Sequence, residues 1–211
     1  MMPVFFNDTL CYLHIPKCGG LSVSAAAKAG LPGYTEPGQK RNARQPGSPI
    51  GHIRAADFEQ FTGRPLNSFK QVFATIRPPV QCEWSKWNFW RRRFYKDGNN
   101  VAWRHPADQF CWERSFDEYI ASGVEPFNDW YCQDIAKWAR ADYNQAGRFK
   151  WWLLDEVETV DISDIKTINA ILRRHGCTQK VKHLHRTGAG PCQVTDSQKK
   201  KIEAYYVGSR S

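Results

Sequence analysis

The chain has 211 residues, of which 41% are hydrophobic and 24% charged, and this composition excludes collagen-like, low-complexity and wholly disordered proteins. Its length suits one sizeable core, so we expect a single domain over residues 1–211. Thirty Lys and Arg residues against 21 Asp and Glu give a formal net charge of +9, which indicates an anionic partner. Nucleic acid, an acidic polymer, a membrane surface and a phosphorylated small molecule all fit that charge.

The sequence predicts a cytoplasmic protein. No segment approaches the ~20 consecutive apolar residues of a membrane span. The N-terminus has no Lys or Arg before its short apolar run, which is unlike a secretory signal. The seven cysteines form no Cys-x-x-Cys pair, so we expect reduced thiols.

Two strands and a helix are predicted in the first part of the chain. Residues 9–15 are apolar and β-favouring, and residues 71–76 form a second such run. A turn rich in glycine follows the first strand and leads into a helix expected over residues 22–28, which Gly30 ends. Residues 33–49 are rich in Gly, Pro, Gln and Arg, and they predict a surface loop.

The rest of the chain is predicted to be mainly helical. A helix is expected to begin at Pro78–Pro79 and run to about residue 95, with Trp84, Trp87 and Trp90 on a face that packs in a core. The further predictions are a turn at 97–100, an irregular stretch at 101–111, a strand at 149–154, and helices at 115–121, 128–141, 163–175 and 195–206. Strands alternating with helices predict an α/β fold with a small, mainly parallel sheet flanked by helices.

The segment HIPKCGGLS, from His14 to Ser22, carries the clearest chemical signal. It places two glycines and Lys17 between the end of a strand and the start of a helix. The N–H groups and the dipole of a helix N-terminus favour an anion, and Lys17 adds a full positive charge. No Gly-Lys-Ser/Thr sequence occurs in the chain, so this is not a Walker A loop. The alternative is a simple turn whose lysine faces solvent.

This segment closely resembles the HIPKTGGTS sequence that opens carbohydrate-type sulfotransferases, the group of heparan sulfate 2-O- and chondroitin sulfotransferases. The resemblance implies a P-loop-like sulfotransferase fold and a loop that holds the 5′-phosphosulfate of 3′-phosphoadenylyl sulfate (PAPS). Cys18 and Leu21 stand where the family commonly has threonine. The cofactor-binding residues that the resemblance implies here are Pro16, Lys17, Cys18, Gly19, Gly20, Leu21 and Ser22, and Lys17 contacts the oxygen that bridges sulfate and phosphate.

A second segment, FATIRPPV from Phe73 to Val80, resembles the family's R-D-P-V-x-R-x-x-S region. In the family that region binds the 3′-phosphate of the cofactor, which assigns this role to Arg77 and Ser85. A guanidinium forks onto phosphate oxygens, and a serine hydroxyl donates a further hydrogen bond. Pro78 replaces the usual aspartate and Cys82 the second arginine. Without the resemblance, a surface ion pair for Arg77 and a helix hydroxyl without a ligand for Ser85 would explain these residues.

Two further residues are assigned by resemblance. Gly51-His52 is similar to a Gly-His element in which the family's histidine is the catalytic base, and a neutral imidazole suits proton removal near pH 7. Arg186 lies in a basic, glycine-containing stretch similar to the family's loop over the adenosine phosphate. A loop histidine without a catalytic role is the alternative for His52. His14 is interpreted as structural, and no metal site is predicted.

The resemblance implies an enzyme that moves a sulfuryl group from PAPS to an acceptor hydroxyl, with a carbohydrate, and an acidic glycan in particular, as the expected acceptor. The product would be adenosine 3′,5′-bisphosphate. The alternatives are a basic nucleic-acid-binding module, which explains the charge but not the order of strand, turn and helix, and a relative that binds the nucleotide without transferase activity. A nucleotide kinase is disfavoured because the Walker lysine is missing.

Replacing the expected base tests its assignment. Because a base contacts the acceptor and not the nucleotide, His52→Ala should leave binding of adenosine 3′,5′-bisphosphate nearly intact while turnover falls by about 10²–10⁴. The wild-type rate should rise with pH through a histidine-like ionisation that the variant loses, which pH-resolved transfer assays measure. Near-normal turnover of His52→Ala would remove this residue from the mechanism and leave His14, Glu36 or Asp57 as candidates.

Overall fold

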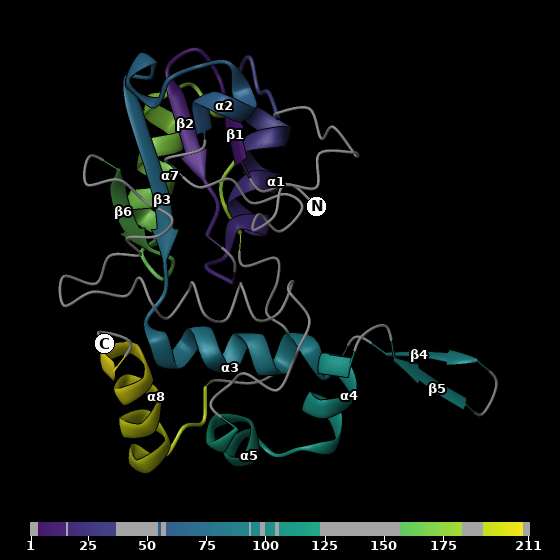
Figure 1. Ribbon diagram of the computed structural model, residues 1–211. Coiled ribbons are helices and arrows are strands. Elements are labelled where there is room, and N and C mark those ends of the chain that lie inside the picture. Colours follow the sequence, from purple (N-terminus) through teal and green to yellow (C-terminus); the bar gives the residue numbers. More distant parts are fainter. Residues whose placement is uncertain are drawn as a thin grey trace. The chain divides into compact units, whose positions relative to one another are not determined.

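The structure is a computed structural model, shown in Figure 1, and it describes residues 4–15, 17–36, 55, 58–92, 94–97, 100–103, 106–122, 157–182 and 192–208. The chain forms two compact units. The first unit comprises Met1–Arg77 and Ala146–His185, and the second comprises Pro78–Gln145 and Arg186–Ser211. None of the helices in the described part has the length and apolar character of a membrane-spanning segment.

A four-stranded sheet forms the centre of the first unit. Its strands are β1 (Val4–Phe6), β2 (Leu10–Leu13), β3 (Gln71–Ile76) and β6 (Glu158–Asp161), in the order β1-β2-β3-β6. β1 pairs with β2 in antiparallel orientation, whereas β2–β3 and β3–β6 are parallel pairs. The predicted α/β class with a small, mainly parallel sheet is therefore confirmed.

Helices cover both faces of this sheet. Side chains alternate along a strand, so Leu10 and Tyr12 of β2 point to one face. On that face pack α1 (Gly20–Gly30) and α7 (Ile165–Arg174), whose contribution to the core is Val23, Ala26, Ala27, Ile168, Ile171 and Leu172. On the other face Phe6 meets Phe58 of α2 (Phe58–Thr62), with ring centroids 6.0 Å apart. A 3₁₀ turn, η2 (Leu66–Ser68), precedes β3.

In its described part, the second unit contains four helices and a hairpin. They are α3 (Pro79–Trp90), β4 (Phe94–Asp97), β5 (Asn100–Trp103), α4 (Pro106–Glu113), α5 (Phe116–Ala121) and α8 (Asp196–Gly208). Trp87 and Trp90 are buried in its core with Trp84 packed against it, which confirms the predicted apolar face of α3. The Arg91 guanidinium lies 4.4 Å from the Trp87 ring centre, so one of the arginines beside this face is a cation–π partner.

Three sequence predictions differ from the observed elements. Residues 101–103 and 106–111 are not irregular, because β5 and α4 occupy them. The helix that starts at Pro79 ends at Trp90, before the β-favouring residues of β4 pair with β5. β1, α2 and β6 were not predicted from the sequence, because they are short elements that only their partners stabilise. The predicted helix at 128–141 and strand at 149–154 lie outside the described residues.

A buried ion pair on α3 is hydrogen-bonded to a residue of α5 in the second unit. The Lys86 ammonium lies 2.7 Å from Oε1 of Glu83, and both side chains are almost fully buried, with 3% and 1% of their surface exposed. The Tyr119 hydroxyl donates to the other carboxylate oxygen of Glu83 at 2.9 Å. Removing either charge would leave the other one buried without a counter-charge, which would destabilise the protein.

Neutralising Glu83 should therefore cost much of the stability of this protein. We expect Glu83→Gln to lower the free energy of unfolding by about 3–5 kcal/mol, because the buried Lys86 ammonium loses its counter-charge. Urea denaturation measures this loss. Glu203→Gln is the matched control, since Glu203 pairs with Lys199 at 3.9 Å on the exposed side of α8 and should cost about 0–1 kcal/mol. Equal costs for the two variants would contradict the structural role of the Glu83–Lys86 pair.

Candidate anion-binding site

The HIPKCGGLS segment connects two elements of the first unit. β2 ends at Leu13 and α1 begins at Gly20, so the connecting loop carries Lys17. Leu13 lies opposite Ala74 of the parallel strand β3, which ends at Ile76 and is followed by Arg77. Because the carboxyl ends of parallel strands meet at one edge of a sheet, the loop and Arg77 leave the sheet at the same edge, as the neighbouring arrows β2 and β3 in Figure 1 indicate.

The backbone of this loop curls through left-handed conformations. Lys17 has φ 67° and Gly19 has φ 81°, and Lys17 is the one described residue other than glycine with a positive φ. A side chain in that region carries a steric cost of about 1–2 kcal/mol, and such costs concentrate at functional sites. Gly19 is the N-cap of α1, so no side chain caps the helix, and the first turn contains no acidic residue. The positive end of the helix dipole is therefore not neutralised locally.

Both glycines are required by the protein interior. A Cβ added to Gly19 would lie 2.4 Å from Cγ1 of Ile162, and one added to Gly20 would lie 2.0 Å from Cδ2 of His14. The His14 side chain is 6% exposed and fills the space beside Gly20. Its interpretation as a structural residue agrees with this packing. The two glycines let the loop lie close to the side chains of Ile162 and His14. This packing is a structural reason for the glycines that does not depend on any ligand.

Cys18 is held from two directions. Its N–H donates to the carbonyl of Ile15 at 3.2 Å, and its carbonyl accepts a hydrogen bond of 2.7 Å from Oγ1 of Thr75 on β3. Thr75 Oγ1 also lies 2.7 Å from the Tyr12 hydroxyl, and all three side chains are fully buried. Cys18 thus anchors the loop to the sheet. Thr75 was not among the residues predicted from the sequence, although a hydroxyl inside the apolar strand QVFATI is a signal for such a contact.

The other predicted site residues lie in three different settings. Lys17, Ser22 and Arg77 are half-buried and Leu21 is exposed. The Ser22 N–H donates to the Gly19 carbonyl at 3.0 Å, which leaves its hydroxyl as the group to offer a ligand. Ser85 belongs to the second unit, where it is buried on α3. Pro16, His52 and Arg186 lie outside the described residues.

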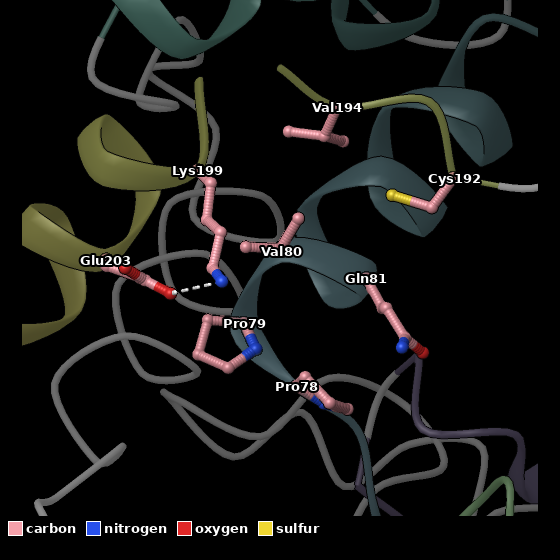
Figure 2. A pocket seen from close by; sticks show the side chains of 8 residues that line it. All are labelled: Pro78, Pro79, Val80, Gln81, Cys192, Val194, Lys199 and Glu203. Carbon is pink, nitrogen blue, oxygen red and sulfur yellow. Dashed lines mark ion pairs between the residues drawn. The ribbon is translucent and has the colours of Figure 1, made fainter. Parts of the chain in front are cut away.

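The second unit contains a cavity of about 530 Å³ at the start of α3 (Figure 2). Its lining comes from the first turn of α3, from the segment before α8 and from α8 itself: Pro78, Pro79, Val80, Gln81, Cys192, Val194, Lys199 and Glu203. Lys199 pairs with Glu203 at 3.9 Å. The described side chains that line the cavity therefore bring no excess positive charge, and Ser85 does not line it.

Comparison with known proteins gives no match for this chain among family models, curated proteins or solved structures. The case for a function therefore depends on the chain's own motifs and on their geometry.

A double-mutant cycle tests the packing beneath the loop. Gly20→Ala should destabilise the protein by about 1–3 kcal/mol, because its methyl group overlaps the His14 ring. Adding His14→Ala should make room for the methyl group, so that the double variant loses less stability than the sum of the two single losses, by about 0.5–3 kcal/mol. Chemical denaturation measures all of these values.

Gly63 supplies the control for this cycle. A Cβ at Gly63 meets no atom within 4 Å, so Gly63→Ala and His14→Ala should have additive effects. Additive effects for the Gly20–His14 pair as well would contradict the close packing beneath the loop.

Proposed function

We propose that this protein is a PAPS-dependent sulfotransferase with a P-loop-like sulfotransferase fold. It moves a sulfuryl group to the hydroxyl of a carbohydrate, with an acidic glycan as the expected acceptor. The observation that carries the proposal is the strand–loop–helix unit β2–α1, whose loop bears Lys17 and shares its edge of the sheet with Arg77. The motif sequences that resemble the family fall at these two places.

The loop supplies the groups that a phosphosulfate needs. The first N–H groups of a helix have no intrahelical partner, and those of α1 follow a cap without a side chain. Lys17 and the Ser22 hydroxyl add a charge and a donor. In the proposed site these groups stabilise the negative charge that grows on the leaving phosphate, which is usually the largest contribution to this kind of catalysis.

Arg77 of the first unit offers its guanidinium to the 3′-phosphate in this proposal. The roles that the resemblance implies for Ser85 and Arg186 stay predictions. The positions that depart from the family have local explanations. Pro78 is the N-cap of α3 and Pro79 occupies its first turn, where proline is favoured. Cys82 is 1% exposed, so a thiol packs at a position where an arginine would need a buried counter-charge.

In the proposed transfer, one bond to sulfur breaks and one forms, so the oxidation state does not change and no redox partner or metal ion is needed. PAPS supplies an activated sulfuryl group: the sulfur–oxygen bond to its phosphate breaks while a bond from sulfur to the acceptor oxygen forms. His52 takes the proton of the acceptor hydroxyl, and Lys17 faces the oxygen that becomes a phosphate oxygen of adenosine 3′,5′-bisphosphate. The protein's own contribution is positioning and charge stabilisation.

The experiment that tests the proposal combines binding and transfer with the full-length chain. Calorimetry should show that adenosine 3′,5′-bisphosphate binds more tightly than ATP, and labelled PAPS should transfer its sulfuryl group to at least one member of a panel of glycans. Equal binding of the bisphosphate and ATP, or an affinity for RNA that falls steeply with salt in the absence of transfer, would contradict the proposal.

Lys17 should affect turnover far more than nucleotide affinity. We expect Lys17→Asn to lower the rate of transfer by about 10²–10³, because the variant loses one transition-state donor. Asparagine tolerates the left-handed conformation at this position, so the fold should be kept. The control is Lys28→Asn in the last turn of α1, which removes an exposed lysine and should leave turnover unchanged. If bisphosphate affinity and turnover fall equally, Lys17 is only a binding residue.

A further inference from the structure

The anchor of the loop on β3 fixes the direction of one peptide group. The hydroxyl of Thr75 has a single hydrogen, which it donates to the Cys18 carbonyl at 2.7 Å. The bond of 2.7 Å between Tyr12 and Thr75 therefore has the Tyr12 hydroxyl as its donor. Burial raises the pKa of the Tyr12 phenol above its ordinary value, which keeps this donor protonated. The hydrogen bonds run in one direction, from Tyr12 to Thr75 to Cys18.

This chain of hydrogen bonds also orients the neighbouring N–H group. The peptide that joins Cys18 to Gly19 is trans, so its C=O and its N–H point in opposite directions. Since the carbonyl points inward to Thr75, the Gly19 N–H points outward, away from the sheet. Gly19 is the N-cap of α1, so this N–H group lies next to the first N–H groups of the helix along the chain.

Sterics alone do not fix this orientation. A flip of the peptide plane changes ψ of Cys18 and φ of Gly19, and glycine populates both signs of φ. With no hydroxyl at position 75, the buried Cys18 carbonyl would lose the hydrogen bond that directs it toward β3. Turning outward to water would satisfy it. The flipped peptide would then present a carbonyl oxygen, which repels an anion, in place of an N–H.

We infer that Thr75 is a positioning residue of the anion-binding loop: its hydroxyl, supported by Tyr12, turns the Gly19 N–H toward the 5′-phosphate group of the nucleotide. The inference rests on the proposed function, and it names a residue that does not contact the nucleotide. The Thr75 hydroxyl, although fully buried within an apolar strand, thereby has a role in binding.

The test measures binding of two nucleotides by calorimetry. Thr75→Val has nearly the same shape and lacks the hydroxyl, so it should weaken binding of adenosine 3′,5′-bisphosphate by about ten- to a hundredfold, the usual range for a lost hydrogen bond to a charged group. Adenosine 3′-phosphate has no 5′-phosphate, and its affinity should not change. A general loss of structure would weaken both nucleotides.

Two variants separate orientation from stability. Thr75→Ser keeps the hydroxyl and should restore most of the affinity for the bisphosphate. Tyr12→Phe removes a buried hydroxyl of the same chain but leaves the bond from Thr75 to Cys18, so it should bind the bisphosphate nearly as the wild type does. Circular dichroism establishes that each variant is folded at the temperature of the measurement.

The possible results separate the inference from the proposed function. If the wild type binds the bisphosphate and Thr75→Val binds it equally well, the inference is overturned and the proposed function remains. The inference is also overturned if Tyr12→Phe weakens binding as much as Thr75→Val, or if Thr75→Val weakens both nucleotides alike. A wild type that binds no bisphosphate overturns both.

Discussion

The parallel pairing of β2 with β3 is the constraint on which the candidate site depends. Its register places Tyr12 opposite Phe73, so Tyr12 and Thr75 point to the same face of the sheet and their hydroxyls meet. A slip of one residue would send these side chains to opposite faces and leave the Cys18 carbonyl without its donor. The same pairing brings the loop and Arg77 to one edge. The loop's shape is therefore a consequence of strand register as much as of its own residues.

The glycines of the loop show how one sequence feature can have two explanations. In sequence, Gly19 and Gly20 favour an anion, because a backbone without side chains approaches a ligand closely. In the structure, Ile162 and His14 occupy the space that their Cβ atoms would need. The interior thus accounts for the glycines, and the case for an anion rests instead on Lys17, on the uncapped start of α1 and on Arg77. The left-handed Lys17 adds to that case, because its conformation carries a cost that the loop's packing must offset.

In the second unit, several aromatic side chains and two of the basic ones have structural contacts. Trp84 and Trp87 pack around Phe116, and Arg91 lies over Trp87. Lys86 is committed to Glu83 inside the unit. Glu83 neutralises Lys86, and Arg91 packs on an aromatic ring, so these two cations do not indicate a ligand. The cationic groups to which the proposal gives a role are Lys17 and Arg77 in the two motifs, and Arg186.

The sequence by itself determined the fold class, the extent of β3, the capped helix α5, and the order of strand, glycine turn and helix that places Lys17. These features follow from local periodicity and from turn and capping chemistry, which act over a few residues. The structure alone decided that Thr75 holds Cys18, that His14 fills the space beside Gly20, and that β6 pairs with β3. Each of these depends on residues 6 to more than 80 positions apart, such as Phe73 and Glu158 in register. Such contacts leave no local pattern, because the energy that selects them comes from burial in the assembled core.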